Sequence, residues 1–457
     1  MSAMPPATRT PRAPLMWRAF LVFLGPMMLS NILQALSGTV NNVYLGQMLG
    51  VGALASVSAF FPVLFFLISF SIGLGAGASV LIGQAWGANE PDRVKAIAGT
   101  TLCVGLVAGV VVAVFGGVFT DVFLGWLGTP ADILPGATAY ARVMLIAMPG
   151  LFVFLLVTSM MRGVGDTYTP LLTLLLSTAV GLLLTPALIR GWLGLPRMGV
   201  ASGAWASVLS YVAALVWLAW YLRRRGHALA PDAAFMKHLR IDRMLLVKVL
   251  RIGLPTGVQM VVIALSEVAV LFLVNRFGSD ATAAYGAVNQ VVAYVQFPAL
   301  SIAITSSILG AQAIGAGRGH TLGQIARTGI VLNLVLTGSL VLLVYLFSRR
   351  LLGFFITSAA VLEIAQTLLH IMLWSSIVFG MSAVLSGLMR ASGSVLVPTL
   401  NSVFAILAIE VPVAWLLSER IGLNGIWVAY PVAFLSMLAL QTSYYRLVWR
   451  HKPLRRL

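Results

Sequence analysis

Two acidic side chains occupy positions where they could bind a proton or a cation inside a membrane. The 457-residue chain has 12 Asp and Glu, and only Glu267 and Glu410 fall well inside long apolar segments. An acidic residue at the bilayer centre costs about 2.5–3.5 kcal/mol to insert, so it persists only with a partner or a function. A desolvated carboxylate can hold a proton or coordinate Na⁺ through hard oxygen ligands. We therefore expect both residues to bind the ion, with Glu267 as the candidate Na⁺ ligand; a packed structural glutamate is the alternative for each.

Amide side chains in the same half of the chain could complete such a site. Their oxygens could complete a Na⁺ shell around Glu267 or accept hydrogen bonds from a substrate. Hydrogen bonding between helices is an equally good alternative. These residues are Gln259, Asn289, Gln290 and Asn401.

The first long apolar segment carries a second group of amides. Asn31, Gln34, Asn41 and Asn42 are spaced so that all four share one face of a helix. We expect that face to point into a central cleft, where the side chains either contact ligand or pack. The candidate binding residues of this group are Gln34, Asn41 and Asn42.

Composition places these residues in a membrane protein. The chain is 60% hydrophobic and 9% charged, with a mean hydropathy of +0.99. A soluble domain has about 25% charged residues because water must solvate its surface. The net charge of +17 is concentrated at loops and chain ends, a distribution typical of a topology signal, so we expect no nucleic-acid partner.

Apolar length predicts twelve membrane-spanning helices and an all-α membrane protein. About 20 apolar residues are needed to span a bilayer. The predicted spans are residues 18–46, 51–83, 95–119, 134–160, 169–189, 199–222, 249–275, 281–311, 325–347, 361–388, 398–418 and 424–446.

The distribution of Lys and Arg predicts the orientation. If both termini are cytoplasmic, the cytoplasmic segments hold 22 of these residues, including Arg9 and Arg12, and the outer loops hold 6. Positive charge is retained on the cytoplasmic side. We therefore expect a multi-pass protein of the bacterial inner (plasma) membrane with cytoplasmic N and C termini.

The chain repeats itself with an offset of 228 residues. Met161-Arg162-Gly163 recurs as Met389-Arg390-Ala391, and Gly83-Gln84-Ala85 recurs as Ala311-Gln312-Ala313. Six helices in each half give both halves the same orientation, so we predict two parallel six-helix repeats around a central cleft. The predicted domains are an N-terminal lobe (1–224), a cytoplasmic linker (225–248) and a C-terminal lobe (249–457).

These motifs resemble the multidrug and toxic compound extrusion (MATE) family. The matching residues are Pro26, Val40 to Gly46, Gly73 to Gly77, Gln84 to Ala88, Met161 to Thr167, and the repeat partner of that last segment at 389–394. The resemblance covers the whole chain. It implies a secondary active antiporter for multidrug efflux that exports amphipathic, mostly cationic organic compounds in exchange for H⁺ or Na⁺ by alternating access, with Glu267 matching the family's helix 7 glutamate.

The chain departs from the family pattern in its N-terminal half. Asn41 stands where the family usually has Asp, so the ion-coupling role falls to Glu267 and Glu410 in the C-terminal half. The alternative function is a lipid-linked precursor flippase of the same wider superfamily, which would favour a basic cleft.

The sequence gives no sign of an enzyme. No GxxxxGK[ST] or HExxH motif occurs, and the predicted spans have no Asp-rich metal cluster. We expect no cofactor beyond the coupling ion, small-molecule organic cations and membrane lipid as partners, and a monomeric transporter.

Overall fold

A computed structural model describes residues 13–454, 456 and 457, and the regular secondary structure in that part of the chain is helical. Arg9, Arg12 and Arg455, which belong to the predicted charge distribution, lie outside the described residues. Ten helices are long and apolar enough to cross a membrane singly, and two bent helix pairs give up to two further spans. Twelve spans were predicted, and most of the observed helices extend beyond the predicted ends.

The described part of the first half contains eight α-helices. They are α1 (Ala13–Leu49), α2 (Val51–Gly87), α3 (Pro91–Val118), the short α4 (Thr120–Trp126), α5 (Leu134–Ile146), α6 (Met148–Gly163), α7 (Tyr168–Arg190) and α8 (Ser202–Arg225).

After the short α9 (Ala233–Lys237), the second half repeats this order. It comprises α10 (Arg243–Asn275), α11 (Ser279–Gly315), α12 (Leu322–Gly353), α13 (Ala359–Met372), α14 (Ser375–Ala391), α15 (Leu396–Phe404), a π-helical turn (Ala405–Glu410), α16 (Val411–Ile421) and α17 (Leu423–Leu447).

The predicted helix 134–160 is in fact two helices. The axes of α5 and α6 differ by 54° across a break at Ala147. Pro149 lies in the first turn of α6. Proline has no N–H to donate, and its ring crowds the carbonyl four residues earlier, so it favours a break here. Proline alone does not require one, since α1, α2 and α10 continue through Pro26, Pro62 and Pro255.

The predicted helix 361–388 is also broken, for a different reason. The axes of α13 and α14 differ by 42°. The hydroxyl of Tyr345, on α12, donates to the carbonyl of His370 at 3.2 Å and accepts from the N–H of Trp374 at 3.1 Å. The Tyr345 hydroxyl therefore replaces the backbone hydrogen bond that would join residues 370 and 374 in a continuous helix. A side chain inserted between the backbone groups of successive turns bends the helix axis.

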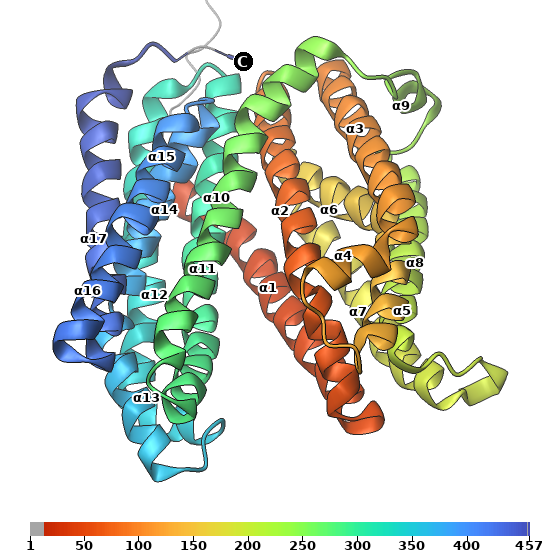
Figure 1. Cartoon of the computed structure of the whole chain (residues 1–457). Helices are drawn as coiled ribbons and strands as arrows, with labels where there is room; N and C mark the ends of the chain where they lie inside the picture. Colours follow the sequence, from red (N-terminus) through yellow and green to blue (C-terminus); the bar gives the residue numbers. More distant parts are fainter. Residues whose placement is uncertain (1–12, 455) are drawn as a thin grey trace, which may run out of the picture.

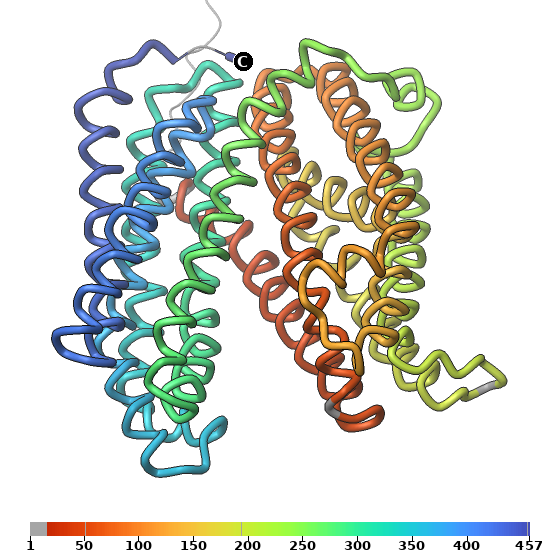
Figure 2. The backbone as a smooth tube through the Cα atoms, in the orientation of Figure 1, coloured from red at the N-terminus to blue at the C-terminus, as the bar shows by residue number. Residues whose placement is uncertain are grey.

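If each bent pair is counted as one span, the two halves form two lobes of six membrane-spanning segments each. In Figures 1 and 2 the N-terminal half (red to yellow-green) lies beside the C-terminal half (green to blue), and α1 runs obliquely between them. The C-terminus and the connection through α9 lie at the same end of the molecule, at the top of Figure 1. We call this end the C-terminal face.

One inter-lobe contact brings backbones together through glycine. A methyl group at Gly73 would lie 2.4 Å from the backbone oxygen of Gly253, and one at Gly77 would lie 2.3 Å from that of Val249. Only glycine permits α2 and α10 to approach this closely, as in other closely packed membrane helices.

The repeat-related contact, between α1 and α11, is built differently. The residues 228 positions after Gly73 and Gly77 are Ser301 and Thr305. Here side chains fill the space: Asn31 Nδ2 donates to Ser301 Oγ at 3.2 Å, and Thr305 Oγ1 lies 3.7 Å from the sulfur of Met27. A backbone contact between α2 and α10 thus corresponds, at the repeat-related position, to a side-chain contact between α1 and α11.

Candidate functional site

Glu267 lies in a hydrogen-bonded cluster formed by α10, α11 and α17. The hydroxyls of Tyr285 and Tyr430 both donate to Glu267 Oε2, the second at 3.1 Å, and the two hydroxyl oxygens are 3.0 Å apart. The fully buried indole of Trp427 stacks on Tyr285, with ring centroids 5.7 Å apart and an interplanar angle of 9°. Stacking fixes the phenol, so one carboxylate and two phenol oxygens are held at one point of the C-terminal lobe.

The second predicted acid, Glu410, is connected to this cluster through Ser266. Its Oε1 accepts a hydrogen bond from Ser266 Oγ at 2.8 Å, and Ser266 precedes Glu267 on α10. Glu410 is buried, with 4% of its surface exposed, and it ends the π-helical turn. Pro412 follows two residues later and has no N–H to donate to a carbonyl of the preceding turn, so the helical hydrogen bonding is irregular beside this acid. The structure therefore brings the two predicted acids into one region.

Neither carboxylate forms an ion pair with Lys, Arg or His in the part of the chain that is described. A buried negative charge without a counterion is costly, so such a group is stabilised by taking up a proton or a cation. The oxygens of the two acids, Ser266 and the two tyrosines are hard ligands of the kind that Na⁺ and protons prefer. The arrangement can therefore bind either ion.

The predicted amides of this lobe lie at different distances from the cluster along the helices. Asn289 follows Tyr285 by one turn on α11, and Gln259 precedes Glu267 by two turns on α10. Gln259 Oε1 is buried without a hydrogen-bond partner among the described residues. No hydrogen bond in that part of the chain joins Gln290 or Asn401 to either carboxylate.

The amides of α1 do not act as one row. Asn31 contacts the other lobe at Ser301, whereas Asn41 accepts from Thr185 Oγ1 of α7 at 3.2 Å, within its own lobe. Gln34 and Asn42 are exposed. The expectation that this face points into a cleft stays a prediction, and Asn41 differs from the other amides in bonding to α7 of its own lobe.

Sequence reasoning missed the hydroxyl groups around Glu267. Tyr285 and Tyr430 are 145 residues apart in sequence, and no local pattern connects them. Ser266, beside Glu267, could have been noted as a neighbour. Amide oxygens are common cation ligands, so the sequence pattern pointed to Asn and Gln and not to phenols.

Two glutamines join the lobes reciprocally at the C-terminal face. Gln84 Nε2 on α2 donates to the carbonyl of Ala391 at 2.8 Å, and Gln312 Nε2 on α11 donates to that of Gly163 at 3.0 Å. Donors and acceptors are each separated by 228 residues, so the second bond is the repeat image of the first. We call this pair of bonds the glutamine clasp.

Glycines make the clasp possible. A methyl group at Gly87 would lie 2.1 Å from the carbonyl oxygen of Gln312, and one at Gly315 would lie 1.9 Å from that of Gln84. These two glycines are also related by the 228-residue offset. The ends of α2 and α11 therefore cross in direct backbone contact.

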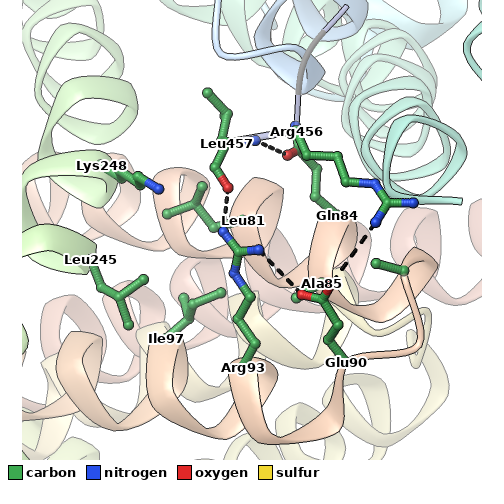
Figure 3. A pocket seen from close by; sticks show the side chains of 11 residues that line it. Leu81, Gln84, Ala85, Glu90, Arg93, Ile97, Leu245, Lys248, Arg456 and Leu457 are labelled. Atoms are coloured by element: carbon green, nitrogen blue, oxygen red, sulfur yellow. Dashed lines mark hydrogen bonds and ion pairs between the residues drawn. The ribbon is translucent and has the colours of Figure 1, made fainter. Parts of the chain in front are cut away.

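The C-terminal tail strengthens the same contact, as Figure 3 shows. The N–H of Leu457 donates to Gln84 Oε1 at 2.9 Å, and Arg93 donates to the Leu457 carbonyl oxygen. Glu90 pairs with Arg93 at 3.2 Å and with Arg456 at 3.8 Å. The tail thus follows the C-terminal lobe and binds α2 and α3 of the N-terminal lobe.

Comparison with known proteins places this chain among transporters. A family model described as MatE matches residues 26–187 and 255–416, once in each lobe. The chain is 46% identical over 455 residues to the probable multidrug resistance protein YoeA of Bacillus subtilis, covering 99% of this chain and 98% of that protein. It is 27% identical to the probable multidrug resistance protein NorM of Thermotoga maritima, covering 88% and 86% of the two chains.

Solved structures share the fold. The crystal structure of a mutant of the Vibrio cholerae MATE transporter VcmN has a TM-score of 0.89 and 20% sequence identity, and the alignment covers 97% of this chain and 99% of that chain. A MOP superfamily transporter from Pyrococcus furiosus gives a TM-score of 0.85 with 96% of this chain covered.

Proposed function

Because the chain belongs to the MATE family of multidrug transporters, we propose that it is an antiporter that exports amphipathic organic cations in exchange for H⁺ or Na⁺. The proposal rests on one observation: Glu267 and Glu410 are two carboxylates on apolar helices, and neither has a basic partner among the described residues. Ser266, which precedes Glu267 on α10, donates to Glu410 and brings the two acids into one region. Such acids mark ion pathways in transporters.

In this proposal the coupling ion binds at Glu267. Tyr285 and Tyr430 hold the carboxylate, and their oxygens, with that of Ser266, complete the ligand set for Na⁺ or bond the neutral acid after protonation. Glu410 serves as the second acidic group. A cationic substrate and the coupling ion compete for the same carboxylate, because two positive charges held close together repel each other. Competition of this kind couples export to ion entry.

The predicted lobes, residues 1–224 and 249–457, are the moving units in this proposal. The glutamine clasp and the close glycine contacts of α2 involve helix segments near the C-terminal face. Breaking these contacts and forming others at the opposite face would give alternating access by rocking of one repeat against the other. The linker 225–248 would stay outside the membrane during this motion.

The orientation follows from charge. The basic C-terminal ends of α8 and α17 lie at the C-terminal face, and positive segments are retained in the cytoplasm. We therefore propose that this face is cytoplasmic, in the inner membrane of a bacterium, and that the described arrangement is closed toward the cytoplasm. The transporter works as a monomer in this proposal, with organic cations and membrane lipid as its partners.

Reconstituted vesicles test this function. Export of a fluorescent organic cation is measured with a Na⁺ gradient alone and with a pH gradient alone. Glu267→Gln should reduce the ion-driven rate by about 10- to 100-fold, the range expected when a hydrogen-bonded charged group is lost.

The matched control is Glu363→Gln, which neutralises an exposed acid on α13 and should leave transport unchanged. If transport driven by either gradient survives Glu267→Gln at the wild-type rate, Glu267 is not the coupling residue. If neither gradient drives transport in the wild type, antiport itself is rejected.

A further inference from the structure

The C-terminal end of α8 carries an unusual combination of aromatic, apolar and basic side chains. A shallow groove there is lined by Val216, Ala219, Trp220, Arg223 and Arg224. Val216 is followed three and four residues later by Ala219 and Trp220, and Trp220 three and four residues later by Arg223 and Arg224, so the five share one face of the helix. Val216 is 66% exposed and Trp220 is 51% exposed. In a membrane-spanning helix, an apolar face exposed to this extent contacts lipid acyl chains.

The two arginines lie where this apolar face ends. Arg223 and Arg224 are in the last turn of α8, and both are exposed. The guanidinium of Arg224 lies 4.7 Å from the ring centroid of Trp220, a cation–π contact that fixes its position at the membrane boundary. Acyl-chain contacts and positive charge therefore occur together on a single helix face.

The positive charge of these arginines is not neutralised by protein. Neither forms an ion pair with a carboxylate among the described residues. Of the acids in the linker and the turn before α7, Asp232 pairs with Lys95 at 3.5 Å and Asp166 lies 3.7 Å from His227. The groove therefore retains an uncompensated charge of two.

Arg223 is also oriented. Its Nε donates to the carbonyl of Pro231 at 2.7 Å. This bond uses one donor and holds the guanidinium at the helix end, which leaves the two terminal nitrogens available. A guanidinium with both terminal nitrogens available can bind two oxygens of a phosphate.

We propose that this groove is a binding site for an anionic phospholipid. One acyl chain lies along Val216 and Ala219, Trp220 lies at the level of the glycerol backbone, and the headgroup phosphate binds Arg223 and Arg224. Charge complementarity identifies the occupant, because a zwitterionic lipid would bring a second positive charge toward two arginines. The site is independent of ion coupling and of the transported substrate.

Native mass spectrometry of the purified protein tests the site, with phosphatidylglycerol and phosphatidylcholine titrated separately. The wild type should bind at least one phosphatidylglycerol in preference to phosphatidylcholine. The double variant Arg223→Gln, Arg224→Gln should weaken phosphatidylglycerol binding by about 30-fold and leave phosphatidylcholine binding unchanged. Glycerol phosphate, which lacks acyl chains, should compete only weakly if the apolar groove contributes.

The matched control is Arg349→Gln, Arg350→Gln, which removes an exposed arginine pair at the end of α12. It should retain phosphatidylglycerol binding. Equal loss in the control and test variants would show that only net charge matters and would overturn the proposal, as would unchanged binding in the test variant. Size-exclusion profiles and Tm show whether each variant is folded. Trp220→Ala is a second test variant, which should weaken phosphatidylglycerol binding without changing the net charge.

Discussion

Removing one glutamine of the clasp should shift the equilibrium between arrangements in which the lobes are joined and parted at the C-terminal face. Gln312 donates one bond, to the Gly163 carbonyl, whereas Gln84 donates to Ala391 and also accepts from Leu457. One such bond contributes about 1 kcal/mol net. Gln312→Ala should therefore favour the parted arrangement by about fivefold and Gln84→Ala, which loses two bonds, by about 30-fold.

Spin-label distance measurements across the C-terminal face provide the assay. Asp92 and Arg318 are exposed and lie in opposite lobes, so each can be replaced by labelled cysteine. Cys103 is the only cysteine of the chain, and Cys103→Ala gives a clean background. The parted arrangement appears as a population at longer distance, and its fraction gives the shift in free energy.

Gln441→Ala is the matched control. Gln441 is buried and donates to the carbonyl of Pro398 at 2.7 Å, so it makes the same kind of bond within one lobe. Its loss should lower Tm without changing the distance distribution. The reasoning fails if neither clasp variant changes the distribution, if Gln441→Ala changes it as much, or if Gln312→Ala has the larger effect.

Three further outcomes follow from contacts described above or in the linker. Removing residues 453–457 should favour the parted arrangement, measured with the same label pair, because the tail bonds to both Gln84 and Arg93 are lost. Tyr345→Phe should lower stability by about 1–3 kcal/mol in thermal unfolding, since the bend between α13 and α14 loses its inserted hydroxyl. The backbone N–H of Phe235, and then Lys95, hold the pKa of Asp232 below its ordinary value of 3.8. The stability that Asp232 gives by capping α9 is therefore fully present above pH 3.8 and is lost as the pH falls through the lowered pKa. Hydrogen exchange at the N–H of Phe235 should detect that loss.

The positions of the helices could be predicted because apolar length alone determines them. Pro149 favours a break at Ala147, but proline alone does not locate breaks, because α1 and α10 continue through Pro26 and Pro255. The bend at Trp374 could not be predicted, because it depends on a tyrosine hydroxyl supplied by α12. A hydropathy pattern describes each helix separately and contains no information about a neighbour's side chain.

The candidate site was predictable in its acids and not in its surroundings. Glu267 and Glu410 stand out because charge is rare in membrane helices. Their connection through Ser266, and the convergence of Tyr285 and Tyr430, depends on how α10, α11, α17 and the π-helical turn pack. The 228-residue repeat shows that Gln84 and Gln312 correspond. That each donates to the other lobe could not be predicted, because it depends on how the two lobes pack together. The coupling roles of the acids and amides remain predictions.

The glutamine clasp has the pattern of an isologous interface. In a two-fold symmetric dimer, residue i of one subunit contacts residue j of the other, and j contacts i in return. Gln84 with Ala391 and Gln312 with Gly163 reproduce this exchange within one chain. In a homodimer of six-helix units, a single glutamine codon would supply both bonds, and any mutation would remove both. Covalent fusion separates the two copies genetically, which allows Gly73 and its counterpart Ser301 to diverge while the clasp is kept.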